Sequence, residues 1–379
     1  MKNDFLEYYG RYNISPVKQD IQNIDIHFAR RKKLYRQCGV PVLAFRDADV
    51  LEVGPGGGYN TLAFFQWNCR HVDLVEANET GRREMQKLFE KHAISTGQYK
   101  IFPCKIEDYL TDKKYDIVIA EGFLSHIYNQ EEVINKLSGL VDENGIIVIT
   151  CCDDVCFFIE LMKRLVALFL TRNISDYNQK TEYLADFFKP QLDTLKGVSR
   201  SAKDWVQDQI LNPAGVNGME LTMSQAVDYF GEAFDLLGCS PRMFTDYSWY
   251  KDIWYDCKSE IKEQFNRKRL SLLSASMPEA ILPIETANIL VQHFESIKKL
   301  ATDYEKTKNI CRIDEILWEM DLVEKDIPQN FDNEFKLVFC EIKEILYCVQ
   351  REEELDMEKY PHFFSAFGRT LQYMSFVKK

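Results

Sequence analysis

The sequence predicts an α/β fold, in which a doubly wound sheet carries a helical cap insertion and a helical C-terminal subdomain. Two observations predict it. From Asp47 to about Cys152, short apolar β-rich runs alternate with amphipathic segments of helix length, which is the pattern of repeated βα units. After Cys152 this alternation stops, and helical patterns separated by prolines dominate the rest of the chain.

The expected strands of the sheet lie in the first half of the chain, with one late addition. They cover residues 49–54, 72–77, 99–103, 115–122, 145–151 and 234–241. A tight turn is expected over Asp142–Gly145, directly before the fifth strand. Helices are expected over residues 59–67, 79–92, 106–110 and 131–140, and later over 255–272, 284–308, 311–322, 332–352 and 361–376.

These elements suggest five successive segments of the chain. An N-terminal helical extension, with a helix from about Val17 to just before Gly39, precedes the core. The segments are the extension 1–44, the core 45–153, a helical cap insertion 154–230, a return to the sheet 231–254 and a helical subdomain 255–379. We expect a homo-oligomer, if one forms, to use the C-terminal helices.

Composition and charge exclude several classes of protein. The 379 residues suffice for about two and a half domains. With 46% hydrophobic and 28% charged residues, the chain is neither disordered throughout nor a disulfide-stapled miniprotein. The formal net charge of −12 has the wrong sign for neutralising phosphates over a broad face, so nucleic acid and anionic lipid are disfavoured as partners.

Cysteine usage and hydropathy indicate a reduced, cytoplasmic protein. The eleven cysteines form no CxxC pair and no cluster at zinc spacing. The first residues lack the basic end and apolar run of a signal peptide, and no membrane-spanning stretch is expected. The most apolar segment, 155–170, is interrupted by Glu160, Lys163 and Arg164, and we interpret it as an amphipathic helix.

The sharpest local signal is the loop Gly54-Pro55-Gly56-Gly57-Gly58, where an apolar strand ends and a helix begins. Glycines there allow a tight turn and bring backbone N–H groups close to a ligand at a helix N-terminus. The loop lacks the GK[ST] ending of a P-loop. Tyr59 stands where a dinucleotide fingerprint has its last glycine, which weakens the interpretation of the loop as a nicotinamide-dinucleotide site.

With Glu52, the loop resembles the first motif of class I S-adenosylmethionine-dependent methyltransferases, an acidic residue followed by GxGxG. The resemblance implies a Rossmann-like methyltransferase sheet that binds S-adenosylmethionine (SAM). It extends along the sheet: Glu76 matches the acidic residue that holds the ribose hydroxyls. The site residues that it implies for the cofactor are Glu52, Gly54, Gly56, Gly58, Glu76, Ile106, Glu107 and Glu121.

The adenine contacts depart in part from the family pattern. Ile106 is expected to pack on the adenine, but Lys105 stands where the family commonly has an aspartate. The polar partner of the adenine is therefore either Glu107 or Asp108. Glu121 and His126 follow the fourth strand, at the edge where open α/β sheets bind ligands.

His126 is the candidate catalytic base, because a hydroxyl or amine acceptor gains from a base whose pKa is near neutrality. The alternative is a histidine that packs the start of a helix. Asp153 and Asp154 could bind Mg²⁺, but an Asp that caps the following helix is the favoured interpretation, and no metal is expected. Capture of a soft element by Cys151, Cys152 and Cys156 is disfavoured, because adjacent strand residues point to opposite faces.

Aromatic clusters are the remaining candidates for contacts with cofactor or substrate. Residues 5–12 could fold over the cofactor or simply pack against the core. Trp205 and the segment Ser240–Asp252 mix aromatic and charged residues, which suits either a sugar site or a buried aromatic layer.

The two segments around Trp205 and Ser240 are similar to those of uncharacterised bacterial methyltransferases that occur with surface-polysaccharide genes. This resemblance implies methyl transfer to an oxygen or nitrogen of a small polar substrate, such as a sugar or nucleotide-sugar. The alternatives are a non-catalytic SAM-binding scaffold that uses its helical C-terminus, and an NAD-type oxidoreductase that uses the glycine loop. A DNA base N-methyltransferase is disfavoured, since no NPPY-type motif follows the fourth strand and the charge is acidic. An RNA or protein methyltransferase is disfavoured as well.

Overall fold

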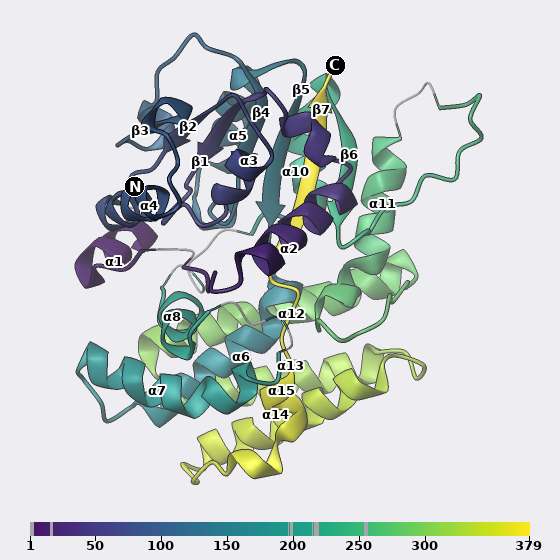
Figure 1. Ribbon diagram of the computed structural model, residues 1–379. Coiled ribbons are helices and arrows are strands. Elements are labelled where there is room, and N and C mark those ends of the chain that lie inside the picture. The colour runs from purple at the N-terminus through teal and green to yellow at the C-terminus, as the bar shows by residue number, and fades with distance from the viewer. Residues whose placement is uncertain are drawn as a thin grey trace. The chain divides into compact units, whose positions relative to one another are not determined.

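The structure is a computed structural model that describes residues 4–15, 18–195, 197, 200–213, 215, 220–253 and 257–379 (Figure 1). The chain forms two compact units. The sheet unit comprises Met1–Cys151, Gly218–Lys262 and Leu371–Lys379, and the helical unit comprises Cys152–Asn217 and Glu263–Thr370. Each unit is therefore built from segments that are distant in the sequence.

A seven-stranded sheet with the order β3-β2-β1-β4-β5-β7-β6 forms the centre of the sheet unit. Its strands are β1 (Asp49–Val53), β2 (His71–Val75), β3 (Tyr99–Phe102), β4 (Tyr115–Ala120), β5 (Val141–Cys151), β6 (Phe234–Ser240) and β7 (Gln372–Lys378). The first five strands are parallel, and Val53 pairs with both Val75 and Ala120. The carboxyl ends of β1, β2 and β4 therefore lie level at one edge, which confirms the predicted α/β sheet.

The predicted helix over 361–376 is wrong in its second half. Residues 361–365 form the short helix α15, but Gln372–Lys378 form β7, which pairs antiparallel with both β5 and β6. Gly368 separates the two elements. The strand was missed because both strands that pair with it, β5 and β6, are far away in sequence. No hairpin or βα pattern in the sequence therefore predicts it.

The turn predicted over 142–145 lies inside β5 instead. Val141 pairs with Tyr115 and Ile146 pairs with Ile117, so the intervening residues form an irregularity in the ladder. Asn144 has a positive φ of 59° there. The strand therefore begins four residues earlier than the sequence pattern suggested.

Helices cover both faces of the sheet (Figure 1). Aromatic and aliphatic side chains of three helices, α2 (Ile24–Gln37), α3 (Leu62–Gln66) and α4 (Glu79–Lys91), form one core with Val50, Val72 and Ile117. The other helices of this unit are α1 (Asp4–Tyr12), α5 (Gln130–Leu140), α10 (Met223–Phe230) and the start of α11 (Lys258–Lys268). Short 3₁₀ helices are η1 (Val42–Phe45), η2 (Thr96–Gln98), η3 (Ile106–Asp108), η4 (Leu124–His126) and η6 (Gly231–Ala233).

The N-terminal helix starts later than expected. Asn23 caps α2, because its side chain accepts a hydrogen bond from the backbone N–H of Ile26. The predicted start at Val17, like Pro16, lies outside the described residues. A second helix of the N-terminal extension, α1, lies before Pro16 and was not expected.

The helical unit joins the predicted cap insertion and C-terminal subdomain around one apolar core. Its helices are α6 (Asp154–Leu170), α7 (Tyr177–Leu192), α8 (Ala202–Trp205), the π-helical η5 (Val206–Ile210), η7 (Arg269–Leu272), α12 (Ile284–Thr307), α13 (Cys311–Asp326), α14 (Asn333–Gln350), η8 (Met357–Lys359) and α15 (Pro361–Ser365). Trp205 packs on Phe188 and Phe367 in this core, at centroid distances of 5.4 and 6.2 Å. Of its two predicted roles, the buried aromatic layer is therefore the one observed.

The interpretation of 155–170 as an amphipathic helix is wrong. The side chains of Glu160, Lys163 and Arg164 in α6 are buried with relative exposures of 3, 0 and 2%. They bond to backbone groups within the helical unit and do not form a solvent-facing stripe. In the part of the chain that the structure describes, no helix is long and apolar enough to cross a membrane.

Candidate cofactor-binding site

The glycine loop leaves the carboxyl end of β1 in a conformation that needs its glycines. Gly54, Gly56 and Gly58 all have positive φ, between 56° and 76°. A Cβ on Gly58 would lie 2.6 Å from Met85 Cγ, and one on Gly54 would lie 3.2 Å from the Phe123 ring. The three predicted glycines are therefore required for the shape of this loop.

Glu76 connects the glycine loop to the end of β2. Its Oε2 accepts a hydrogen bond from Gly56 N–H at 2.7 Å, and its Oε1 accepts one from Asn78 N–H at 2.6 Å. Burial raises the pKa of this carboxyl group, and the two backbone hydrogen bonds oppose that rise. Each carboxylate oxygen can accept a further hydrogen bond, so Glu76 retains capacity for two hydroxyl donors.

Glu52 lies in β1, just before the loop, and is 3% exposed. Its Oε2 accepts a 2.6 Å hydrogen bond from the Thr61 hydroxyl. Burial raises its pKa to about 8, because the site offers the charge little solvation. With this pKa, the carboxyl group is mostly protonated at pH 7 in the cofactor-free protein.

Glu121 follows β4 and is bound by α2. Arg31 donates two hydrogen bonds to its carboxylate, at 2.9 and 2.6 Å, and the Tyr35 hydroxyl donates a third at 2.6 Å. Burial alone would lower the pKa of Arg31, but Glu121, Tyr35 and Tyr373 together outweigh it and raise that pKa well above its usual value. Asn60, beyond the glycine loop, donates to the same carboxylate at 3.3 Å. Glu121 thus ties the loop region to the N-terminal extension.

Ile106 and Glu107 lie in η3, after β3. Ile106 is 4% exposed. Glu107 is exposed; its side chain accepts a 3.5 Å hydrogen bond from Asn129, and its backbone carbonyl accepts one from Lys136. Contact of either residue with an adenine ring stays a prediction.

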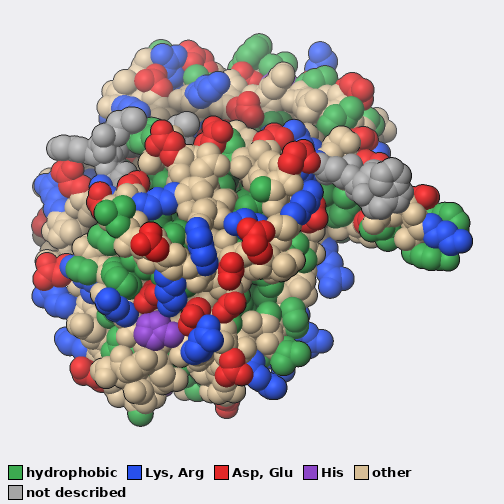
Figure 2. Space-filling model, turned by 90° about the horizontal axis from the view of Figure 1, so that it is seen from above, with side chains coloured by type: hydrophobic (Ala, Val, Ile, Leu, Met, Phe, Trp, Pro, Cys, Tyr) green, Lys and Arg blue, Asp and Glu red, His purple; other side chains and the backbone are tan. Residues whose placement is uncertain are grey.

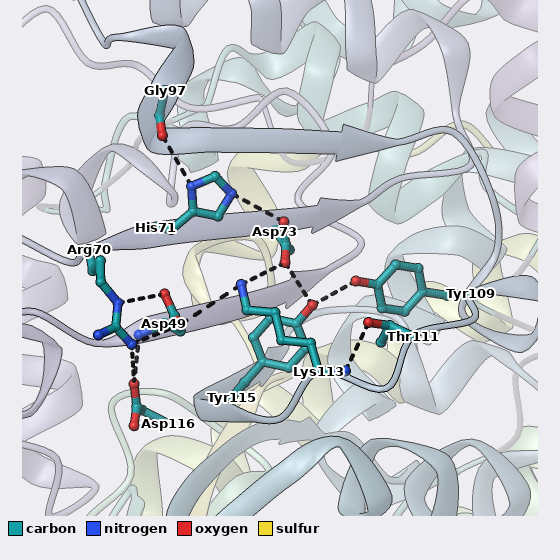
Figure 3. Close-up of polar contacts among 10 residues, drawn as sticks. All are labelled: Asp49, Arg70, His71, Asp73, Gly97, Tyr109, Thr111, Lys113, Tyr115 and Asp116. Carbon is teal, nitrogen blue, oxygen red and sulfur yellow. Dashed lines mark hydrogen bonds and ion pairs between the residues drawn. The ribbon is translucent and has the colours of Figure 1, made fainter.

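A polar network anchors the segment that follows η3 (Figure 3). The Tyr109 hydroxyl donates to the Tyr115 hydroxyl at 2.6 Å, and Tyr115 donates to Asp73 at 2.7 Å. Lys113 and His71 also lie 3.0 and 3.2 Å from the Asp73 carboxylate. The charged members of this cluster pair with one another, so we interpret it as a structural network. It holds the segment after η3 on the sheet.

His126 ends η4, beyond β4, and α1 approaches it. Its ring centroid lies 6.4 Å from that of Phe5. On the same N-terminal segment, Ser15 is 8% exposed, and a Cβ on Gly57 would lie 3.2 Å from its hydroxyl oxygen. That hydroxyl has no hydrogen-bond partner among the described residues. The segment after α1 therefore brings a buried, unsatisfied polar group to the glycine loop.

The two candidate metal ligands are engaged within the helical unit. Asp153 caps α6 by accepting from Cys156 N–H at 3.0 Å, and Arg269 lies 2.8 Å from its other oxygen. Lys298 lies 2.6 Å from Asp154. This arrangement confirms the helix-capping interpretation of Asp153. No group of metal-ligand residues occurs in the described ranges.

The segment Ser240–Asp252 leaves the sheet at its edge strand. Ser240 lies level with Tyr373 at one end of β6, and Lys258 lies 3.2 Å from Glu232 at the other end. Tyr247, Trp249 and Tyr250 are 91, 58 and 71% exposed. They do not form an enclosed sugar site, and a role in defining the substrate stays a prediction.

Sequence reasoning missed the contribution of α2. His27, Arg31 and Tyr35 are the buried residues of this helix, and His27 Nε2 lies 3.0 Å from the Tyr59 carbonyl. Their spacing of four residues is the signal that could have revealed a buried polar face. It was hidden because Arg31 stands in a run of basic residues.

A family model described as a methyltransferase domain (Methyltransf_31) matches residues 45–209. The chain contains a methyltransferase domain. The match runs from before β1 to η5, and thus covers the glycine loop, Glu76, Glu121 and His126. The match argues against the alternative of an NAD-type oxidoreductase. The domain is of the SAM-dependent methyltransferase class.

Solved structures resemble parts of the chain. The N-methyltransferase NodS of Bradyrhizobium japonicum, in complex with S-adenosyl-L-homocysteine, is 14% identical with a TM-score of 0.32, over 40% of this chain and 75% of that one. A putative SAM-dependent methyltransferase of Listeria monocytogenes is 17% identical with a TM-score of 0.28, over 35% and 57%. PKMT2 of Rickettsia typhi, in complex with AdoHcy, is 18% identical with a TM-score of 0.42, over 63% and 49%. No curated protein matches the sequence.

The residues of the methyltransferase domain fit SAM chemically. Glu76 can accept from two vicinal hydroxyls, and Glu52 would regain its charge next to a bound ammonium group. The unsatisfied hydroxyl of Ser15 offers a further polar contact at the glycine loop. Buried polar groups of this kind are stabilised when a ligand completes their hydrogen bonds.

Proposed function

We propose that the protein transfers the methyl group of SAM to an oxygen or nitrogen atom of a small polar molecule, with a sugar or nucleotide-sugar as the acceptor class. In this proposal His126 is the general base. One observation carries it: His126 follows β4, whose carboxyl end is level with that of β1, where the glycine loop begins. The acidic net charge of −12 supports a small acceptor over a nucleic acid.

The chain's residues would divide the work as follows. The glycine loop with Glu52 would bind the methionine end of SAM, and Glu76 would bind the ribose. Bound SAM supplies a methyl group on a positively charged sulfur. His126 would remove the proton from the acceptor hydroxyl or amine as that atom attacks the methyl carbon in line with the departing sulfur. Phe5 would help exclude water from His126.

The test of the base is the variant His126→Gln, with the exposed His362→Gln as its matched control. Wild-type protein, labelled SAM and a cell extract should yield a product heavier by one methylene unit in mass spectrometry. H126Q should lower the rate of product formation by about 10²–10⁴-fold, the usual contribution of a general base, while SAM affinity stays unchanged. H362Q should behave like the wild type.

Two outcomes would count against the proposal. Full turnover in H126Q would remove this residue from the mechanism. A wild-type protein that binds SAM but methylates nothing in the extract would favour the alternative of a non-catalytic SAM-binding scaffold.

A further inference from the structure

The basic residues of α2 divide into two sets with different surroundings. Arg31 is buried and bound to Glu121, whereas Arg30, Lys32, Lys33 and Arg36 are exposed. Lys33 and Arg36 are three residues apart and therefore share one face of the helix. That face carries positive charge that the candidate cofactor site does not use.

A cavity of about 440 Å³ lies beside this face and gathers three cations. Its lining residues are Lys33, Arg36, Gln37 and Arg242. Arg242 reaches it from the segment after β6, where the next residue, Met243, is buried and its N–H donates to Cys239 Sγ at 3.3 Å. The buried neighbour fixes the backbone from which the Arg242 side chain extends.

The three cations lack the carboxylate partners that other basic residues have. In the described ranges, no Asp or Glu lies within ion-pair distance of Lys33, Arg36 or Arg242, although ion pairs are frequent elsewhere in the molecule. The face in Figure 2 likewise shows acidic and basic side chains interspersed. Three like charges in one hollow of a protein with a net charge of −12 repel one another, so a bound anion would stabilise them.

A larger cavity of about 830 Å³ adjoins the first and shares Arg36, Gln37 and Arg242 with it. Phe244, Ile253 and side chains of β6 give it apolar walls. Its lining also carries charge: Asp235 pairs with Lys379 at 3.1 Å, Lys258 pairs with Glu232 at 3.2 Å, and Asp246 accepts from Ser248 N–H at 2.7 Å. The cations of the first cavity therefore face a hollow with apolar walls and mostly paired charges, which can take an organic body.

We propose that these adjoining cavities bind an organic diphosphate, such as a nucleoside diphosphate. Lys33, Arg36 and Arg242 would bind the phosphate groups, for which guanidinium groups offer paired donors. The organic part would lie in the larger cavity, against Phe244 and Ile253. This site is separate from the candidate cofactor site and does not rest on the proposed function. Three cations in a hollow suit a compact phosphate better than a nucleic-acid backbone, which requires a long basic face.

The proposal is tested by calorimetric titration of the full chain with UDP, ADP, pyrophosphate and uridine, with S-adenosyl-L-homocysteine saturating throughout. At least one diphosphate should bind, and uridine alone should not. Arg242→Gln and Arg36→Gln should each weaken that binding by about tenfold or more, the value of a charge-assisted hydrogen bond. The matched control Lys32→Gln removes an exposed cation of the same helix outside the cavity, and should change affinity by less than about twofold.

Three results would overturn the proposal. In the first, neither UDP, ADP nor pyrophosphate binds the wild-type protein. In the second, K32Q weakens binding as much as R242Q, which would mean attraction to general surface charge. In the third, binding seen without S-adenosyl-L-homocysteine disappears when it is added, which would place the diphosphate in the cofactor site. As the control for folding, R242Q should bind S-adenosyl-L-homocysteine with the same affinity as the wild-type protein.

Discussion

The sheet unit and the helical unit both bury charged side chains, but they use them differently. In the sheet unit, Glu76 bonds to two backbone N–H groups and still has room for two further donors. In the helical unit, Lys163 donates to the carbonyls of Ala366 and Phe364, and Glu160 accepts from Gly368 N–H. The comparison indicates that burial of a charge is not by itself a mark of a site. What distinguishes a site is where the charge lies: Glu76 stands at the carboxyl end of β2 beside the glycine loop, whereas Glu160 and Lys163 bond to the chain that precedes β7.

The largest expected effect is on the helical unit. Lys163→Met would remove an ammonium group that lies 3.5 Å from the Phe367 ring centroid and bonds to the chain before β7. The free energy of unfolding should fall by about 3–5 kcal/mol, because Glu160 and two carbonyls lose their partner. Urea denaturation measures this change. The affinity of the folded protein for SAM should stay within about twofold, since K163M leaves the sheet unit intact.

The double variant Lys163→Met with Glu160→Gln sharpens this test. It removes both charges, so it should lose less stability than the sum of the two single variants. A K163M protein that is as stable as the wild type would contradict the assignment of this pair to the architecture of the helical unit.

The next effect concerns the cofactor. Glu76→Ala should weaken SAM binding about 100-fold, or about 2.7 kcal/mol, because it removes the acceptor for both ribose hydroxyls and frees the Gly56 N–H. Equilibrium binding measures it. Glu79→Ala, at an exposed position on α4, is the control and should change affinity by less than about twofold. If E76A and the wild-type protein bound SAM with equal affinity, Glu76 would be no more part of a site than the buried charges of the helical unit.

The smallest effect per step of the experiment is that of a single pH unit. Burial raises the pKa of Glu52 to about 8, so between its usual value of 4.5 and about 8 the folded protein holds a proton that the unfolded chain releases. Over this window the stability of the wild type should fall by at most about 1.4 kcal/mol per pH unit, and level off above it. Glu52→Gln carries no such proton, so its stability relative to wild type should rise over the same window.

Urea denaturation of the cofactor-free protein at several pH values measures this difference. Glu79→Gln serves as the control, and its stability relative to wild type should stay flat. A flat difference for E52Q as well would mean that Glu52 is charged in the folded protein at neutral pH.

Local features of the sheet unit could be predicted from sequence, and distant ones could not. The glycine loop, Glu52 and Glu76 are recognisable because a strand, a turn and a helix follow one another directly. β7 is not, since both of its partners lie far away in the chain. Arg31 could not be told from its basic neighbours, because only the folded helix determines which of them meets Glu121.

The helical unit shows the same limit. The charges of α6 were expected to face solvent. The return of residues 364–368 to this helix explains why Glu160 and Lys163 are buried, and Arg164 is bound by Asn212 and Glu305. Likewise, the sequence placed residues 154–230 and 255–379 in separate segments, although most of both contribute to one core. In each case the decisive partner is a residue that no local pattern identifies.

The position of β7 has a consequence for synthesis on the ribosome. β5 and β6 are both made before their shared partner, and most of the helical unit emerges in the interval. Until Gln372–Lys378 leave the exit tunnel, each of these strands presents an unpaired edge to other nascent chains. The sheet can close only after translation has passed this strand, so these two edges stay open to wrong pairing during that time.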